Sequence, residues 1–154
     1  MANPKYLKAK KQHSRRDILF SVARVPNSAK VYVGSSDFGV YEMDLSQDKL
    51  QPRSIGKHAS YVTGVALTGE TLITGSYDQK LIWWDVKAGK KIREAEAHSR
   101  WIRGVFASPD GKTIASIADD MVCRLWDAAS GKQIHELRDH KEKTPNHYPS
   151  MLYA

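Results

Sequence analysis

Short runs of β-branched and aromatic residues recur along the chain, and within each run apolar and polar side chains alternate. Clusters of Gly, Asp, Pro and Ser separate the runs, as expected of strands that end in turns. The pattern therefore predicts an all-β chain. Its main strands are expected at residues 18–25, 30–35, 40–43, 49–55, 62–67, 71–76, 80–85, 91–96, 102–107, 113–117, 122–126 and 133–137.

Glycine and proline refine this prediction at the ends of the strands. Gly69 and Gly111 stand in the tight-turn sequences Thr-Gly-Glu and Pro-Asp-Gly, where glycine supplies a positive φ. Pro52 falls inside the expected strand 49–55. Because proline has no N–H to give to a ladder, that strand is expected at the edge of its sheet.

Histidine and aspartate positions divide the strands into repeats. His13, His58, His98 and His140 are separated by 45, 40 and 42 residues. Each of the first three precedes two aspartates that are seven residues apart, namely Asp37 and Asp44, Asp78 and Asp85, and Asp120 and Asp127. Tryptophan precedes the last aspartate in the second and third repeats. A period of about 20 to 50 residues is typical of stacked repeats, propellers among them.

A repeat of this length that ends in Trp-Asp and reopens with His resembles the WD-repeat family. The resemblance covers essentially the whole chain and implies four-stranded antiparallel blades of a β-propeller. It also implies a hydrogen-bonded relay of His, Ser or Thr, Asp and Trp in each blade. The matching positions are His58, Thr74, Asp78 and Trp84 in one repeat, and His98, Ser116, Asp120 and Trp126 in the next.

Such a relay can be understood from its chemical groups. A buried carboxylate without a partner costs on the order of several kcal/mol, and an imidazole N–H can satisfy it. The other imidazole nitrogen can accept from the Ser or Thr hydroxyl, whose oxygen accepts from the indole N–H. In the first repeat His13 and Asp37 are present, but Val33 and Met43 stand where the hydroxyl and the indole would be. That relay is expected to be incomplete.

The repeats predict one partial propeller over residues 1–154. Its parts are a basic arm at 1–12, full blades at 13–57, 58–97 and 98–139, and the start of a fourth blade at 140–154. Residues 5–11 align with residues 91–97, so the arm is expected to be an outer strand. In WD-repeat propellers such a strand completes the last blade and closes the ring. We therefore interpret the chain as the N-terminal half of a longer propeller.

Three blades cannot close a ring, because propellers have about four to eight. The free faces of the first and third blades would expose more apolar surface than soluble monomers usually tolerate. The expected cover is the remainder of the propeller or another chain. Self-assembly of two copies is the alternative, although each junction blade would then have only an inner and an outer strand.

Composition places the chain among folded proteins, since 41% of its residues are hydrophobic. No stretch approaches the roughly 20 apolar residues of a membrane span, and no apolar signal segment follows the basic N-terminus. We therefore expect a cytoplasmic location and no membrane partner. The single cysteine, Cys123, rules out an internal disulfide framework.

The net charge of +7 is concentrated at one end. Residues 1–16 contain six basic and no acidic side chains, so the rest of the chain is nearly neutral. A basic run this short is more often a solvated edge or arm than a binding site. Nucleic-acid binding by the arm, with Tyr61, Tyr77 and Trp101 stacking on bases, is the alternative. It is not favoured, because the neutral body offers no extended track for phosphates.

Catalysis is not predicted. The histidines that begin the repeats are far apart in sequence and are already explained by the relay. Cys123 aligns with Leu81 of the preceding repeat, which indicates a small core residue rather than a nucleophile. The sequence contains neither a phosphate-binding glycine loop nor a paired thiolate motif. We expect no enzyme activity, no metal site and no cofactor.

The resemblance implies instead a scaffold that binds a protein or peptide partner. Partners are expected on the loops that start each inner strand and on the residue before each turn aspartate. Carried over by position, this indicates Tyr61, Thr63, Tyr77, Trp101, Arg103, Asp119, Ser36 and, by a looser equivalence, Arg16. Tyr, Trp and Arg dominate interface hot spots. Trp101 either stands exposed for a partner or folds over its neighbour in the blade, and Trp83 is expected to pack between blades.

Overall fold

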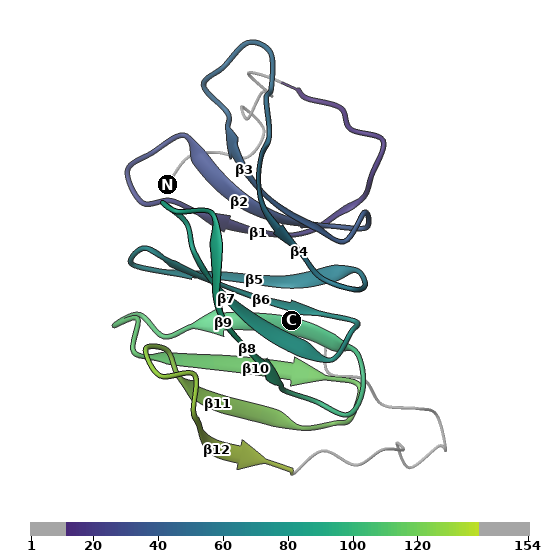
Figure 1. The fold of residues 1–154 in the computed structure, drawn as a ribbon, viewed down its shortest axis with the longest axis vertical. Helices are drawn as coiled ribbons and strands as arrows, with labels where there is room; N and C mark the ends of the chain where they lie inside the picture. Colours follow the sequence, from purple (N-terminus) through teal and green to yellow (C-terminus); the bar gives the residue numbers. More distant parts are fainter. Residues whose placement is uncertain (1–11, 139–154) are drawn as a thin grey trace, which may run out of the picture.

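The structure, a computed structural model, describes residues 12–138 and contains three four-stranded antiparallel sheets (Figure 1). The first sheet consists of β1 (Leu19–Arg24), β2 (Lys30–Ser35), β3 (Gly39–Asp44) and β4 (Arg53–Lys57). The second consists of β5 (Val62–Thr68), β6 (Thr71–Ser76), β7 (Lys80–Asp85) and β8 (Lys90–Glu96). The third consists of β9 (Ile102–Ala107), β10 (Thr113–Ala118), β11 (Cys123–Asp127) and β12 (Gln133–Leu137).

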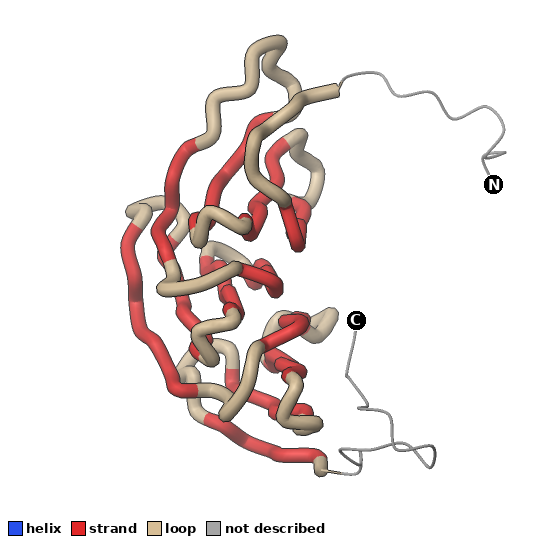
Figure 2. The backbone as a smooth tube through the Cα atoms, turned by 90° about the vertical axis from the view of Figure 1, so that its right-hand side faces the viewer, coloured by secondary structure: helices blue, strands red, loops and turns tan. Residues whose placement is uncertain are grey.

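The three sheets stack in chain order, and the backbone follows an arc (Figure 2). Within each sheet the strands also follow chain order. The first strands of the sheets lie side by side, because β5 contacts both β1 and β9. The prediction of an all-β partial propeller of four-stranded blades is therefore confirmed.

Two of the predicted glycine turns have the expected backbone. Gly69 has a φ of +57° and Gly111 a φ of +70°, values that side chains other than glycine rarely adopt. The Thr68 hydroxyl donates to the Gly111 carbonyl at 2.8 Å, so this turn of the third sheet is also tied to the second.

The prediction for the outer strand of the first sheet is wrong in its position. It places the strand at residues 49–55, whereas β4 covers Arg53–Lys57. Pro52 precedes the strand instead of lying in it, because it has no N–H for the ladder with β3. The shift brings Gly56 against Trp84 of the second sheet. A Cβ at Gly56 would lie 2.2 Å from the Trp84 ring, so this approach requires glycine.

The apolar cores lie between neighbouring sheets. The core between the first and second sheets includes Trp84, which is 4% exposed. The core between the second and third sheets includes Trp83 and Trp126, whose rings are 6.4 Å apart. Trp83 also donates its indole N–H to the Ala128 carbonyl at 3.0 Å. The two adjacent tryptophans thus point to opposite faces of β7, and Trp83 packs between blades as predicted.

Two predicted segments cannot be compared with the structure. The arm strand at residues 5–11 and the start of a fourth blade at residues 140–154 lie outside the described residues. In the part of the chain that the structure describes, no helix has the length and hydrophobicity that a membrane crossing requires.

Candidate partner-binding face

Hydrogen bonds join all four side chains of the second and third relays. His58 Nδ1 lies 2.9 Å from Asp78 Oδ2, and His58 Nε2 lies 2.8 Å from Thr74 Oγ1. Trp84 donates its indole N–H to the same hydroxyl oxygen at 2.8 Å. The third sheet repeats these contacts at 3.0, 2.8 and 2.9 Å with His98, Asp120, Ser116 and Trp126. Both imidazoles are fully buried, so each relay anchors the loop before an inner strand to the sheet.

Burial decides the protonation state of the third relay. It lowers the pKa of His98, so the ring is neutral at pH 7 and carries one N–H. Burial also raises the pKa of Asp120, but the hydrogen bonds from the Ser99 N–H, His98 and Arg124 outweigh this effect and leave the Asp120 pKa lower than usual. The ionised Asp120 accepts the Nδ1 proton, and Nε2 is left to accept from the Ser116 hydroxyl.

The third relay contains a cation that the sequence analysis missed. Arg124 donates to Asp120 at 3.1 Å, to the Ala97 carbonyl at 2.8 Å and to Glu136 at 2.8 Å. It lies directly opposite Ser116 in the β10–β11 register. An arginine in an otherwise apolar strand, opposite a relay hydroxyl, is the signal that could have found it. It cross-links the relay to the outer strand β12.

The first sheet has an ion-pair network in place of a relay. The Nε2 atom of His13 is buried and has no hydrogen-bond partner among the described residues. Arg15 instead donates two hydrogen bonds to Asp17, at 2.7 and 2.8 Å. Asp37 accepts from the Tyr41 hydroxyl at 2.6 Å. Arg15 also lies 3.7 Å from Asp37. The first relay is thus absent, because Tyr41 and Arg15 pair with the turn aspartate in place of a histidine.

Tight turns hold equivalent residues at one end of the three sheets. The residue after each turn aspartate has a positive φ, which is +72° at Phe38, +74° at Gln79 and +61° at Met121. Residues other than glycine seldom adopt such φ values. Each aspartate carboxylate stabilises its turn by accepting the N–H two residues later, at 2.9 to 3.2 Å. The residues before the aspartates are thereby fixed at this end, and they are Ser36, Tyr77 and Asp119.

Five aromatic rings cross this end of the molecule in a continuous row, which we call the aromatic ladder. Phe20 and Phe38 of the first sheet each have ring centroids 5.6 Å from that of Tyr61. Tyr61 lies 5.7 Å from Tyr77. Tyr77 and Trp101 stack with 4.6 Å between centroids and 4° between ring planes. Trp101 is 50% exposed and Tyr61 41%, so the ladder is ordered and accessible at once.

Arg103 fixes the far end of the ladder. Its guanidinium donates to both carboxylate oxygens of Asp119 at 2.7 Å, and also to the Tyr77 hydroxyl. Its Cζ atom lies 4.8 Å from the centroid of the Tyr77 ring and 5.5 Å from that of Trp101. A bidentate ion pair and cation–π contacts restrict the rotamers of all these side chains. Trp101 is therefore exposed, as the first alternative expects, and it stacks on Tyr77 of the second sheet rather than on a neighbour in its own blade.

Two further predicted residues are engaged within the protein. The Thr63 hydroxyl donates to the Ile102 carbonyl and so links the second and third sheets. The Ser36 hydroxyl accepts the N–H of Ile18 at 2.9 Å. Both lie at the same end as the ladder, and their hydroxyls help to hold the sheets rather than standing free.

Arg16 is not equivalent to the predicted contact residues of the other blades. The backbone bond from Ser36 to Ile18 corresponds to the bond from Asp119 to Trp101. Ile18 therefore aligns with Trp101, and the equivalence of Arg16 is wrong because the first repeat reaches its inner strand two residues later. The same shift places Phe20 in the ladder. Phe20 and Phe38 were not predicted. Phe38 directly follows the turn residue Asp37, and this position is the signal that could have found it.

Residues 12–138 contain no cluster of three or more His, Cys, Asp or Glu side chains that could hold a metal ion. Burial raises the pKa of the Cys123 thiol, which leaves less of it as the nucleophilic thiolate.

Comparison with known proteins identifies the repeat. The family profile "WD domain, G-beta repeat" matches residues 51–85 and 89–127, the two segments that contain the complete relays. The chain belongs to the WD40 repeat family. The match begins at residue 51, so it includes β4 but not the other three strands of the first sheet, where the relay is absent.

Fungal WD40 proteins are among its relatives. Nuclear distribution protein PAC1 of Arthroderma benhamiae is 33% identical over 101 residues, which are 59% of this chain and 22% of that protein. PAC1 of Arthroderma otae is 40% identical over 63 residues, 41% of this chain and 14% of that protein. Nuclear distribution protein nudF of Aspergillus niger is 30% identical over 79 residues, 47% of this chain and 18% of that protein. The chain thus spans about a fifth or less of these relatives.

Solved structures share the fold. A chain in the crystal structure of the mitotic checkpoint complex superposes with a TM-score of 0.74 at 23% identity, covering 84% of this WD40 chain and 40% of that one. The structure of U3-55K gives a TM-score of 0.73 at 15% identity, covering 84% and 42%. At these identities the likeness concerns the propeller fold alone.

Proposed function

We propose that this WD40 protein is a non-catalytic scaffold whose aromatic ladder binds a protein or peptide partner. The observation that carries the proposal is the row of five rings, spaced 4.6 to 5.7 Å apart, that crosses all three sheets. Exposed aromatic side chains in a contiguous group are typical of interaction surfaces.

The rigidity of the ladder supports binding. Side chains that are ordered before a partner arrives lose little entropy when it docks, and each immobilised side chain otherwise costs about 0.5 to 1.5 kcal/mol. Asp119 and Arg103 hold the Trp101 end, and the buried relays hold the loops that carry it. The expected partner is therefore an extended segment with apolar side chains that pack on the exposed surfaces of the rings.

The names of the relatives suggest a context for such a scaffold. They are called nuclear distribution proteins, and a role beside them in an assembly is consistent with a binding face. Because the chain spans so little of their length, we do not extend the proposal to a particular partner. A cytoplasmic location stays a prediction.

The test is binding of peptides selected from a displayed random library with the 154-residue chain as bait. Trp101→Ala should weaken the selected peptides by about 2 kcal/mol, which is roughly a 30-fold higher Kd. Tyr61→Ala should have an effect in the same direction. Ile92→Ala is the matched control, because Ile92 is equally exposed, at 46%, but lies on the outer strand β8. Peptides that bind the Trp101 variant as tightly as the parent would refute the proposal.

Salt dependence separates this function from nucleic-acid binding by the basic arm. If six basic side chains of the arm neutralise phosphates, the affinity for nucleic acid should fall by a factor on the order of 10³ between about 50 and 200 mM salt. A peptide on the aromatic ladder should change far less over the same range. A single-stranded oligonucleotide that binds tightly with that steep salt slope, and without effect of Trp101→Ala, would favour the arm instead.

A further inference from the structure

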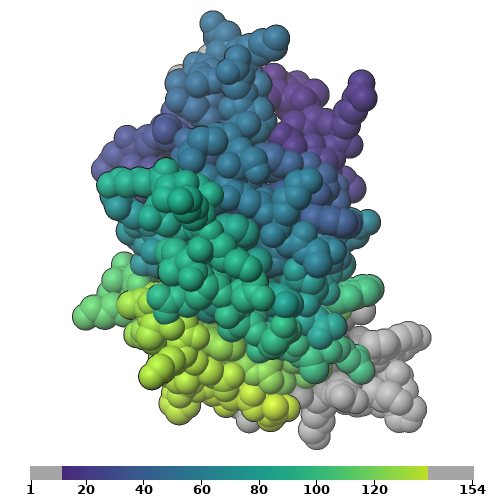
Figure 3. All heavy atoms as spheres, viewed as in Figure 1, coloured from purple at the N-terminus to yellow at the C-terminus, as the bar shows by residue number. Residues whose placement is uncertain are grey.

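The stack has two ends, formed by the first and the third sheet (Figures 1 and 3), and both ends expose apolar side chains. At the first end, the first sheet exposes positions that the second and third sheets bury against the sheet before them. We call this surface the head face, and the strand register assigns to it Leu19, Val22, Val31 and Leu45. Met43 has the same register but is only 2% exposed. In the second and third sheets the equivalent positions belong to the cores between sheets.

Exposure at equivalent positions shows that the head face is a sheet junction without its second sheet. Leu19 is 44% exposed, whereas the equivalent Val62 and Ile102 are both 0% exposed. Leu45 is 42% exposed, whereas the equivalent Val86 is 8% exposed. At these two positions, an apolar side chain is thus buried in the sheets that another described sheet precedes and exposed in the first sheet.

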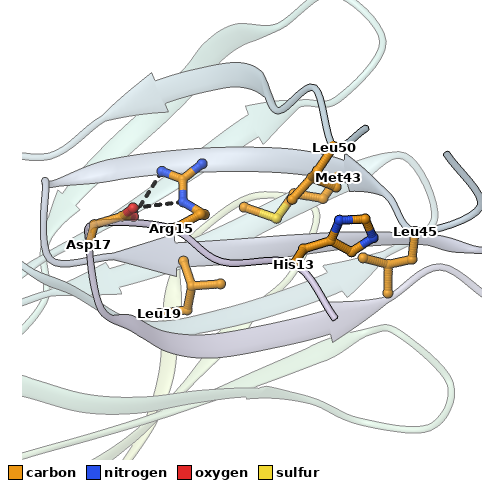
Figure 4. A pocket seen from close by; sticks show the side chains of 7 residues that line it. All are labelled: His13, Arg15, Asp17, Leu19, Met43, Leu45 and Leu50. Atoms are coloured by element: carbon orange, nitrogen blue, oxygen red, sulfur yellow. Dashed lines mark hydrogen bonds and ion pairs between the residues drawn. The ribbon is translucent and has the colours of Figure 1, made fainter. Parts of the chain in front are cut away.

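A pocket of 760 Å³ lies on the head face (Figure 4). Apolar side chains from β1, β3 and the loop after β3 line most of it, while Arg15 and Asp17 pair at one side. His13 also lines the pocket, beside Leu45, and its Nε2 is the buried atom that lacks a hydrogen-bond partner within residues 12–138. The pocket therefore offers apolar contacts and one unused polar atom.

Each junction within the molecule also includes a hydrogen bond to a backbone carbonyl at the same position. Arg53 of the first sheet donates to the Val86 carbonyl at 2.6 Å. Trp83 of the second sheet donates to the Ala128 carbonyl at 3.0 Å. The equivalent acceptor on the head face is the carbonyl of Leu45, to which no described side chain donates. A sheet that completes the junction should bring apolar side chains and one N–H donor.

The opposite end of the stack provides these groups. We call it the tail face, and it comprises Phe106, Ala115, Ile117, Cys123, Leu125 and Leu137. In the second sheet the equivalent positions pack on the third sheet. Phe106, for example, is 46% exposed where Ala66 is 6% exposed. His135 pairs with Leu125, and this is the register position from which Arg53 donates in the first sheet.

We propose that the head face of one copy of this chain binds the tail face of a second copy. The contact repeats the junction that the molecule already makes twice within itself, and it places His135 of the second copy at the Leu45 carbonyl. The sheets that meet are complete, so no strand from outside residues 12–138 is needed. Because the two faces differ, the association is head-to-tail rather than symmetric. It is independent of the aromatic ladder, which lies on the ends of the strands.

The experiment uses light scattering coupled to size exclusion on the 154-residue chain and two variants. Leu45→Glu blocks the head face and Leu137→Glu blocks the tail face, and both residues are exposed, so neither change should prevent folding. The parent chain should give a mass of at least twice 17.3 kDa as its concentration rises. Each variant alone should stay a monomer. Ile92→Glu, on the outer strand of the second sheet, should associate like the parent.

The decisive experiment mixes the two variants. The Leu45→Glu variant retains its tail face and the Leu137→Glu variant retains its head face. A mixture should therefore form a dimer of one copy of each variant, with twice the chain mass, and nothing larger. Within that pair, Cys123 lies in the junction only in the Leu45→Glu copy. Alkylation read by mass spectrometry should therefore be slowed at least several-fold in that copy and unchanged in the other.

Three results would overturn the proposal. They are a parent chain that is monomeric at every concentration, a mixture that remains monomeric, and equal protection of Cys123 in the two copies. If circular dichroism shows that either variant is unfolded, Val22→Glu and Phe106→Glu replace them, because these residues lie on the same two faces and are 64% and 46% exposed.

Discussion

Replacing Thr74 by valine tests whether the relay stabilises the fold. The Thr74 hydroxyl is completely buried, accepts the Trp84 indole N–H at 2.8 Å and lies 2.8 Å from His58 Nε2. Valine has nearly the same shape, and Val33 occupies the equivalent position in the first sheet, so no cavity or clash is expected. The substitution removes hydrogen bonds and little else.

The expected cost follows from the groups left without partners. A buried polar group without a hydrogen bond costs about 1 to 3 kcal/mol, and Thr74→Val leaves two such groups, the indole N–H and the imidazole nitrogen. Because both depend on one hydroxyl, their costs are not additive, and we expect a loss of about 2 to 4 kcal/mol in the free energy of unfolding.

Urea denaturation followed by circular dichroism measures this loss from the shift in midpoint at constant slope. Thr71→Val is the matched control, because it makes the same chemical change in the same strand at a half-buried residue outside the relay. The control should change stability by less than about 0.5 kcal/mol. A Thr74→Val variant as stable as the control would show that the relay does not stabilise the fold.

Further predictions concern packing and pH. Gly56→Ala places a methyl group 2.2 Å from the Trp84 ring and should lower the free energy of unfolding by about 1 to 3 kcal/mol through overpacking. The control Ser54→Ala, in the same strand, should lower it much less. Equal urea midpoints for the two variants would contradict the packing argument. Burial lowers the pKa of His98 from 6.5, so the unfolded chain takes up a proton at a higher pH than the folded one. The stability that neutral, buried His98 contributes is present above about pH 6.5 and is lost as the pH falls through the pKa of His98 in the folded chain. The unfolding free energy should therefore drop between about pH 7 and pH 5.5 more steeply in the parent than in His98→Gln, and parallel curves would exclude His98 as the cause.

The features that could be predicted from sequence are those encoded by neighbours along the chain. Strand alternation located all twelve strands of the structure, with the largest displacement at β4. The two complete relays could be assigned from the resemblance to the WD-repeat family, because Asp78 and Asp120 match its pattern, 20 and 22 residues after a histidine and six residues before a tryptophan. One blade contains all four residues of its relay, so the assignment needed no knowledge of how the blades stack.

The features that could not be predicted depend on contacts between blades. Arg16 was misplaced because two extra residues after His13 change which side chain reaches the face. The contact between the rings of the aromatic ladder could not be predicted, because Phe20 and Tyr61 belong to different sheets and meet only when those sheets stack. Arg124 likewise acquires its role from Ala97 and Glu136, which other strands bring to it.

The sequence by itself determined the repeat, the fold class and the residues of each complete relay, because hydrogen bonds and alternation within a blade act over one period of the chain. Only the tertiary structure decided which aromatic rings form one surface and which apolar faces remain open. Leu19 and Val62 occupy equivalent positions in their sheets, but Leu19 is 44% exposed and Val62 is 0% exposed. The physical reason is that burial depends on the neighbouring sheet, and no property of the side chain itself records whether that neighbour is present.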